Sequence, residues 1–381
     1  MTRTALVVRL DSMGDVLIAG PAVRAVAGTV DRAVMLAGPR GAAAARLLPG
    51  VADVLVFDCP WVGKPAGPYD ASAVAEIVEN IRAIGPDEAL ILTSFHQSPL
   101  PTALVLRQAG VPWIAAASED YPGSLLDRRL PVPDEDAEPV RMLWIAQAAG
   151  YRLPAGDAGR LALRSSLPPA EAGWATDRRY LVLHPGTAAP ARAYPPELWA
   201  DAAAELVAAG WQLVLTGTAA ERALTAGIAA ACAAGDRVID LAGKLELDEL
   251  AGVLSRAAAV VVANTGPAHL AAAVGTPVVS LFAPVVPARR WAPYGVPVTV
   301  LGDQSAACRD SRSIHCPVPG HPCLSSVGAH QIRAAVEELT TTANHHARVG
   351  SSGASGRLQL PTGRATAHSP AERSREEQVV K

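Results

Sequence analysis

The chain has 381 residues, of which 50% are hydrophobic and 18% are charged. This composition excludes a disordered chain, and the length predicts two domains at about 150 residues each. The net charge is −3 and aromatic residues make up 4% of the chain, so neither electrostatic binding of nucleic acid nor base stacking is expected.

The chain carries no recognisable targeting or membrane-spanning signal. No charged start is followed by an apolar region and a small-residue cleavage site, so we expect no signal peptide. The apolar stretch 257–263 is far shorter than the ~20 residues that span a bilayer. We expect a cytoplasmic protein with at most peripheral membrane contact.

Short apolar runs alternate with helical patterns in the first 150 residues. Strands are expected at 4–10, 34–37, 54–57 and 89–93, with a helix running to Val26 and another over 72–84. Such alternation predicts an α/β fold in which helices cover both faces of a parallel sheet. The pattern stops near Tyr151, where prolines and glycines become frequent.

A second set of α/β units follows. Its strands are expected at 180–184, 211–216, 238–241, 260–263 and 277–282, and its helices at 196–209, 221–234, 248–257 and 268–274. Beyond about 340 small and polar residues dominate without apolar periodicity. We therefore expect an amino-terminal domain over 1–160, a linker over 161–178, a carboxy-terminal domain over 179–340 and a disordered tail over 341–381.

The first candidate site residue lies in the loop after the first strand. Ligands of open parallel sheets bind at the carboxyl ends of strands, so two facing halves would form a cleft. Asp15 follows Gly14 there, with Asp11 and Ser12 as competing polar groups. Asp15 either caps the next helix or acts as a general base whose pKa is raised by partial burial.

Two strand ends of the second half carry candidate donor-binding groups. Thr187, in the sequence His-Pro-Gly-Thr, and Arg192 suit phosphate oxygens, although that sequence alone also fits a simple turn. After the next strand, the Glu221 carboxylate either accepts hydrogen bonds from ribose hydroxyls or is a first-turn glutamate favoured by the helix dipole.

The stretch from Asn264 to His269 is the most informative. It predicts a strand end, a Gly-Pro turn and a helix start, where backbone N–H groups form an anion site. His269 in the first turn either contacts a ligand or packs in the core.

Three late cysteines lie close together in the sequence. Cys308, Cys316 and Cys323 are interleaved with His315 and His321, which makes a zinc site conceivable. The spacing lacks a C-x-x-C pair, so a loop-ordering cluster of thiols or one local disulfide is favoured.

Taken together, the motifs resemble glycosyltransferase family 9, which contains the ADP-heptose:lipopolysaccharide heptosyltransferases. The resemblance rests on RLDSMGD at 9–15 with Pro21, HPGT at 184–187, DLAGK at 240–244 with Glu249-Leu250, NTGPAHLA at 264–271, and Cys316-Pro317 with Cys323. It spans about residues 3–340.

The resemblance implies a GT-B fold, in which two Rossmann-like domains face each other across a cleft. It implies an inverting, metal-independent transferase without a cofactor, of the kind used in lipopolysaccharide core biosynthesis. The carboxy-terminal domain would bind an ADP-sugar or other NDP-sugar, and the amino-terminal domain a glycan or small-molecule acceptor.

Site residues also follow from the resemblance. Asp15 would take the proton of the acceptor hydroxyl. The donor would be bound by Thr187, Arg192, Thr216, Gly217, Glu221, Asn264, Thr265, Gly266, Pro267, Ala268 and His269. The acceptor would be bound by Arg9, Ser12, Gly14, His96 and Gln97.

The chain departs from the family pattern at three places. Asn264 stands where the family usually has an aspartate that contacts the donor sugar, and Arg192 stands where it has a lysine for the phosphate. The loop 93–98 carries no lysine or arginine cluster for a phosphorylated acceptor. Donor sugar, nucleotide base, acceptor and oligomeric state therefore stay open.

Two other functions fit the same fold. A nucleotide-sugar 2-epimerase would need several acid and base groups around the sugar, whereas Asp15 is a single candidate in the opposite domain, which favours transfer. A non-catalytic nucleotide-sugar-binding protein would explain Asn264 but not Asp15.

Overall fold

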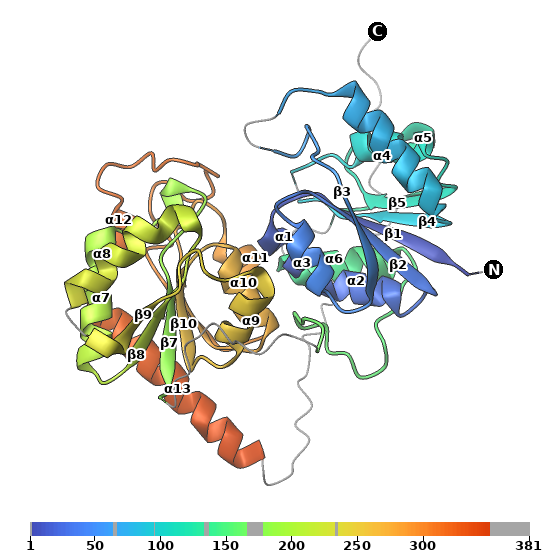
Figure 1. Cartoon of the computed structure of the whole chain (residues 1–381). Coiled ribbons are helices and arrows are strands. Elements are labelled where there is room, and N and C mark those ends of the chain that lie inside the picture. The colour runs from blue at the N-terminus through green and yellow to red at the C-terminus, as the bar shows by residue number, and fades with distance from the viewer. Residues whose placement is uncertain are drawn as a thin grey trace, which may run out of the picture. The chain divides into compact units, whose positions relative to one another are not determined.

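The structure, a computed structural model, describes residues 2–63, 67–94, 96–132, 137–165, 178–232 and 235–350, with side chains up to residue 341. Residues 1–343 form one compact unit that contains two six-stranded sheets (Figure 1). In each sheet every strand pair is parallel.

The first sheet has the strand order β3-β2-β1-β4-β5-β6. Its strands are β1 (Thr4–Arg9), β2 (Arg32–Ala37), β3 (Val51–Val56), β4 (Glu88–Ile91), β5 (Trp113–Ala117) and β6 (Arg128–Leu130). Its helices are α1 (Met13–Ile18), α2 (Gly20–Ala27), α3 (Ala42–Leu47), α4 (Ala71–Ile84), α5 (Leu100–Gln108) and α6 (Glu138–Ala148).

The second sheet has the order β12-β11-β10-β7-β8-β9. Its strands are β7 (Tyr180–His184), β8 (Gln212–Leu215), β9 (Val238–Asp240), β10 (Ala259–Ala263), β11 (Val278–Leu281) and β12 (Val298–Leu301). The helices around it are α7 (Pro196–Ala208), α8 (Arg222–Cys232), α9 (Leu247–Ser255), α10 (Gly266–Ala273), α11 (Ala288–Trp291), α12 (Pro322–Ser325) and α13 (Ala329–Gly350).

The two sheets share one topology. In chain order each half places its strands as 3-2-1-4-5-6, so the strand order reverses between β1 and β4 in the first sheet and between β7 and β10 in the second. Open parallel sheets bind ligands at such reversal points, outside the carboxyl ends of the strands. Strands β1, β7 and β10 are buried along their whole length, as expected for strands covered by helices on both faces.

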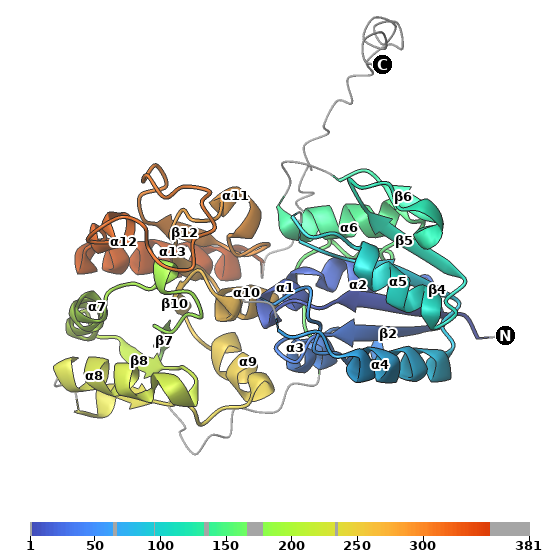
Figure 2. The same ribbon diagram turned by 90° about the horizontal axis from the view of Figure 1, so that it is seen from above.

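The two halves meet at helices α1 and α10, which lie side by side in both views (Figure 2). One apolar cluster runs through this contact and includes Val16 and Leu17 of α1 together with Ala268 and Leu270 of α10. The first turns of both helices, which follow the central strands β1 and β10, are thereby held next to each other.

The α/β class with parallel sheets is confirmed, whereas several elements were not expected from the sequence. Strand β12 follows the strand that the sequence indicates as the last, and helix α13 runs to Gly350, past the expected end of the domain at 340. The rest of the expected tail (351–381) and most of the expected linker (166–177) lie outside the described residues. The domain boundaries stay a prediction. No helix in the described ranges is both long and apolar enough to cross a membrane.

Candidate active site

A cleft of ≈ 340 Å³ lies where the reversal points of the two sheets face each other. Its walls come from both halves of the chain. The first half contributes Asp11, Ser12, Gly14, Asp15, Ile18, Arg40, Val62, Ser94, His96 and Gln97. The second contributes Ala188, Ala189, Arg192, Asn264, Thr265, Gly266, His269, Val286, Trp291, Arg312 and Ile314.

Two glycines allow the halves to approach closely. A Cβ atom at Gly14 would lie 3.0 Å from His269 Cδ2 and 3.2 Å from Gly266 Cα. A Cβ atom at Gly266 would lie 2.3 Å from Met13 Cε. A larger residue at Gly14 would press on the His269 ring and the Gly266 backbone, and one at Gly266 would displace the end of the Met13 side chain.

A buried guanidinium organises the amino-terminal side. Arg9, at the end of β1, is 0% exposed. Its Nη2 donates to Asp15 Oδ1 at 3.1 Å and to Ser94 Oγ at 3.0 Å, and its Nε lies 3.2 Å from Asp11 Oδ2. Arg9 does not line the cleft and contacts the two carboxylates behind it, and its expected acceptor contact stays a prediction.

The expectation that burial raises the pKa of Asp15 is wrong. Burial does favour the protonated form, but the charge of Arg9, the Ser12 hydroxyl donor at 2.6 Å and the nearby His269 together outweigh it, and the pKa of Asp15 is lowered. The Ser12 N–H also donates to Asp15, at 3.2 Å. Asp15 therefore both caps α1 and presents an ionised carboxylate to the cleft.

Asp11 is the second carboxylate of the cleft and has the opposite shift. Burial raises its pKa, and the repulsion from Asp15 adds to this effect. Gln97 Nε2 donates to Asp11 Oδ1 at 2.7 Å, and Gln97 Oε1 accepts from the Ser94 N–H at 2.9 Å. The sequence marks Asp11 only as a competitor of Asp15, although both follow the same strand.

Unpaired polar atoms characterise the carboxy-terminal side. Asn264 Nδ2, Arg192 Nε and His269 Nδ1 are buried and have no hydrogen-bond partner among the described residues. Buried polar atoms in native proteins are nearly always paired, so these three atoms are candidate ligand contacts. Burial lowers the pKa of His269 to about 4, so its imidazole is neutral at pH 7.

The start of α10 supplies part of the expected anion site. Thr265 precedes the helix in extended conformation, and Pro267 lies in its first turn. The Ala268 N–H, which we expected to bind the diphosphate, donates instead to the Thr265 carbonyl at 3.1 Å. Pro267 has no N–H, and the cleft-lining residues Thr265 and Gly266 carry the backbone amides at the start of this helix.

Glu221 lies at the ends of β7 and β8, outside the cleft lining. Its Oε2 accepts from the Thr218 N–H at 2.7 Å and from the Thr218 hydroxyl at 3.0 Å. A Cβ atom at Gly186 would lie 1.9 Å from Glu221 Oε1, so the carboxylate packs directly against the glycine backbone. Glu221 thus lies in a first helical turn, as the helix-dipole interpretation predicts, while the ribose contact stays a prediction.

The remaining expected donor residues are engaged within the protein. Thr216 is 1% exposed, and its Oγ1 lies 3.0 Å from His184 Nδ1. Thr187 Oγ1 accepts from the Ala189 N–H at 3.4 Å. Gly217 packs against Glu221, since a Cβ atom there would lie 3.1 Å from Glu221 Oε2.

The cleft thus brings together most of the residues expected to form the site. Those that line it are Ser12, Gly14, Asp15, His96, Gln97, Arg192, Asn264, Thr265, Gly266 and His269. Arg40 lines the cleft although the sequence analysis did not propose it. It follows β2 at the same sheet edge, and this position after a strand could have identified it as a site residue. Trp291 and Arg312 come from the segment after β11, which carries no motif.

The late cysteines form no disulfide. All five cysteines of the chain are free. Cys308 and Cys323 are 2% and 1% exposed in the apolar core of the second half, and burial raises the pKa of Cys323 to about 12. This arrangement matches the thiol cluster that orders a loop. In the ranges that the structure describes, no three His, Cys, Asp or Glu side chains are grouped to hold a metal ion.

Comparison with known proteins gives a consistent result. The model of the family described as "Glycosyltransferase family 9 (heptosyltransferase)" matches residues 124–320, more than half of the chain. A curated relative, lipopolysaccharide heptosyltransferase 1 of Pseudomonas aeruginosa, is 34% identical over 197 residues, which are 51% of this chain and 48% of that protein. The match thus spans about half the length of this relative.

Solved structures share the fold over nearly the whole chain. The family 9 glycosyltransferase of Veillonella parvula has a TM-score of 0.74 at 18% identity, covering 89% of this chain and 98% of that one. The ADP-heptose lipopolysaccharide heptosyltransferase II of E. coli has a TM-score of 0.69 at 20% identity, covering 90% and 99%. These matches confirm the predicted GT-B architecture. The loop with Asp15 lies before the segment that the family model matches.

Proposed function

The chain belongs to glycosyltransferase family 9, and from this premise we propose that it transfers a sugar from a nucleotide-sugar to a hydroxyl group with inversion at the anomeric carbon. The proposed donor is ADP-heptose, the sugar nucleotide in the name of the E. coli relative. The acceptor is a hydroxyl of a glycan or small molecule, bound on the amino-terminal side of the cleft.

One observation carries this proposal: an ionised carboxylate faces unpaired donors across the cleft. Asp15 is held by Arg9 and Ser12 on one side. Arg192 and Asn264 present unsatisfied N–H groups on the other. The arrangement provides a proton acceptor for the nucleophile and hydrogen-bond donors for the leaving group in one space, as an inverting transfer requires.

The proposed transfer then combines attack of the acceptor oxygen with departure of the diphosphate. Asp15 accepts the proton of the acceptor hydroxyl while the oxygen forms a bond to the anomeric carbon. The bond from that carbon to the diphosphate breaks on the opposite face, and negative charge develops on the leaving diphosphate. Arg192 and the Thr265 and Gly266 amides stabilise this charge.

We propose that the reaction needs no divalent metal or cofactor. Arg192 and Arg312 both line the cleft, and a guanidinium supplies permanent positive charge for a diphosphate. Full turnover in the presence of EDTA supports this part of the proposal. Strict dependence on magnesium, manganese or iron contradicts it and leaves the transfer reaction itself intact.

The donor is tested first by thermal unfolding with ADP, UDP, GDP and ADP-heptose. A ligand at 100 times its dissociation constant adds about 2.7 kcal/mol to the free energy of unfolding. We expect ADP and ADP-heptose to raise the melting temperature and UDP and GDP to do so less. Absence of any effect from all four ligands contradicts a nucleotide-sugar site.

Transfer is tested by incubating ADP-heptose with and without a hydroxyl acceptor. ADP release that depends on the acceptor, with an inverted anomeric configuration in the product, supports the proposal. Conversion of the sugar to its epimer without acceptor indicates a 2-epimerase instead. Nucleotide binding without either product indicates a binding protein.

A further inference from the structure

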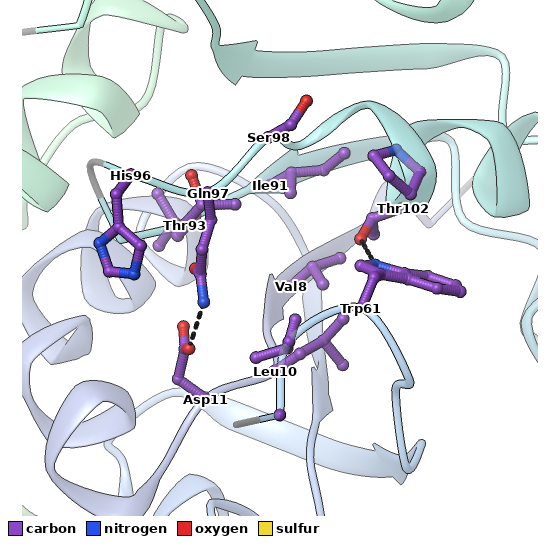
Figure 3. Close-up of a pocket in the computed structure, with 14 residues that line it drawn as sticks. Val8, Leu10, Asp11, Trp61, Ile91, Thr93, His96, Gln97, Ser98 and Thr102 are labelled. Atoms are coloured by element: carbon purple, nitrogen blue, oxygen red, sulfur yellow. Dashed lines mark hydrogen bonds between the residues drawn. The ribbon is translucent and has the colours of Figure 1, made fainter. Parts of the chain in front are cut away.

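A second cavity of ≈ 330 Å³ adjoins the cleft on the amino-terminal side, at the carboxyl ends of β1 and β4 (Figure 3). Its volume is within the range of small-molecule sites, about 300–1,000 Å³. It shares Asp11, Val62, His96 and Gln97 with the cleft. A molecule bound with its hydroxyl in the cleft therefore extends into this side pocket.

The walls of the side pocket are mainly apolar. They include Val8, Leu10, Trp61, Val62, Ile91 and Leu92. Trp61 lies against Phe57, with ring centroids 5.7 Å apart, and its Nε1 donates to Thr102 Oγ1 at 3.1 Å. Because the polar edge of the indole is already bonded, the indole offers a ligand mainly apolar surface.

The polar side chains that the pocket shares with the cleft are Asp11, His96 and Gln97. Figure 3 shows the Asp11–Gln97 pair on one side and the Trp61–Thr102 pair on the other, with Val8, Leu10 and Ile91 between them. Gln97 is bonded to Asp11 and to the Ser94 N–H. A sugar ring placed among the apolar side chains would leave most of its hydroxyls without partners, which is unfavourable.

The charge of the pocket disfavours a phosphorylated ligand. Of the described residues that line it, none is lysine or arginine, and Asp11 brings a carboxylate. The nearby Arg9 is buried and already paired with Asp11 and Asp15. An anionic group would meet the Asp11 carboxylate here, with no lysine or arginine among the described lining residues to offset it.

Resting on the proposed transfer reaction, we propose that the side pocket binds an apolar ring of an uncharged acceptor whose hydroxyl lies beside the Asp11–Gln97 pair. Trp61 and Val62 contact the ring. The hydroxyl is placed near Asp15, which is on the same loop as Asp11. The pocket thus selects an acceptor with an apolar aglycone in preference to a phosphorylated glycan.

The test compares three probes by calorimetric titration without nucleotide: phenyl β-glucoside, methyl β-glucoside and phenyl phosphate. We expect phenyl β-glucoside to bind at least about tenfold more tightly than methyl β-glucoside, because burial of a phenyl ring contributes about that factor. Phenyl phosphate should bind more weakly than phenyl β-glucoside. Equal affinities for the two glucosides, or tightest binding of phenyl phosphate, overturn the proposal.

Variants locate the effect. Trp61→Ala should abolish the preference for the phenyl ring, and Trp61→Phe should restore part of it. Trp211→Ala is the matched control, since Trp211 is also half-buried but lies beside β8 in the second half.

If Trp61→Ala does not fold, Val62→Asp, a change at a half-buried site on the rim, should lose the preference at an unchanged melting temperature. A preference that survives the folded Trp61 or Val62 variant overturns the proposal.

ADP binding is measured on every variant and separates the two proposals. Normal ADP binding with no phenyl preference contradicts the side pocket alone. Absence of ADP binding in the unchanged protein contradicts the proposed function, while the phenyl preference is still read from the nucleotide-free titration.

Discussion

The two halves of the chain have the same strand order but differ in how the polar groups at their strand ends are paired. In the first half the charged groups at the end of β1 are paired with each other, Arg9 with Asp11 and Asp15. In the second half Asn264, after β10, and Arg192 have unpaired buried nitrogen atoms. Topology therefore places both sets of groups at one cleft, and they differ in ion pairing: Arg9 has two carboxylate partners although its Nη1 lacks a hydrogen bond, whereas Arg192 has no ion pair among the described residues.

The largest expected effect concerns the base in the first half. Asp15→Asn keeps the size of the side chain but removes its ability to accept a proton, so turnover should fall by about 10²–10⁴-fold. The dissociation constant of ADP should change little, because the carboxylate acts on the acceptor. Steady-state kinetics and calorimetric titration measure the two quantities.

Asp11→Asn is the matched control for this change, since Asp11 is paired with the same arginine. It should retain more turnover than Asp15→Asn. A greater loss in the Asp11 variant would assign the base to Asp11, and full activity of Asp15→Asn would remove Asp15 from the mechanism.

The next prediction tests the ion pairs of Arg9 with Asp11 and Asp15. Arg9→Met removes the guanidinium from two carboxylates, and loss of one partner of a buried ion pair costs about 3–5 kcal/mol of folding free energy. Arg192→Met should cost much less, because the described residues hold no ion pair of Arg192. Urea unfolding of both variants measures the difference. Equal destabilisation would show that the halves do not differ in this way.

A smaller effect is expected for the ligand side. Arg192→Ala should weaken ADP binding by ~1.5–3 kcal/mol, or roughly 10- to 150-fold, the contribution of hydrogen bonds to a charged group. Arg192→Lys should recover part of this, because it keeps the charge without the two-pronged geometry. Unchanged ADP affinity in Arg192→Ala would remove this residue from the donor site.

The last expected effect is a difference in acid sensitivity between the halves. Burial lowers the pKa of His269 to about 4, so the unfolded chain binds its proton more readily and stability falls as the pH drops from about 6.5 to 4. The pKa of Asp15 is lowered below its ordinary 3.8, so its contribution is lost only in more acidic solution. Stability should change by at most ~1.4 kcal/mol per pH unit for each histidine.

His269→Gln tests this window. The variant should show a flatter dependence of the urea midpoint on pH between 4 and 6.5, while His184, whose pKa is also lowered to about 4 by burial, still contributes. An unchanged slope would mean that His269 is not neutral in the folded protein.

Strand alternation in the sequence predicts the fold class well, because parallel strands buried on both faces are nearly continuous apolar runs. The edge strand β12 was missed because it is only partly buried and mixes apolar with polar positions. The continuation of helix α13 past 340 was missed because its last turns lack the apolar periodicity on which the expected boundary was based.

For the site, the sequence by itself indicated which loops line the cleft, because Asn264 directly follows β10 and Asp15 lies in the first turn of the helix after β1. Only the tertiary structure decided the contacts and the pKa shifts of those groups. Arg9 and Ser12 lower the pKa of Asp15 against the effect of burial, and His269 from the other half of the chain adds to this lowering. The apolar side pocket likewise joins Trp61 to Leu10 and Ile91 from separate strands and loops. Burial and charge act between residues that are close in space, so the separation of residues along the sequence does not predict their effect on a pKa.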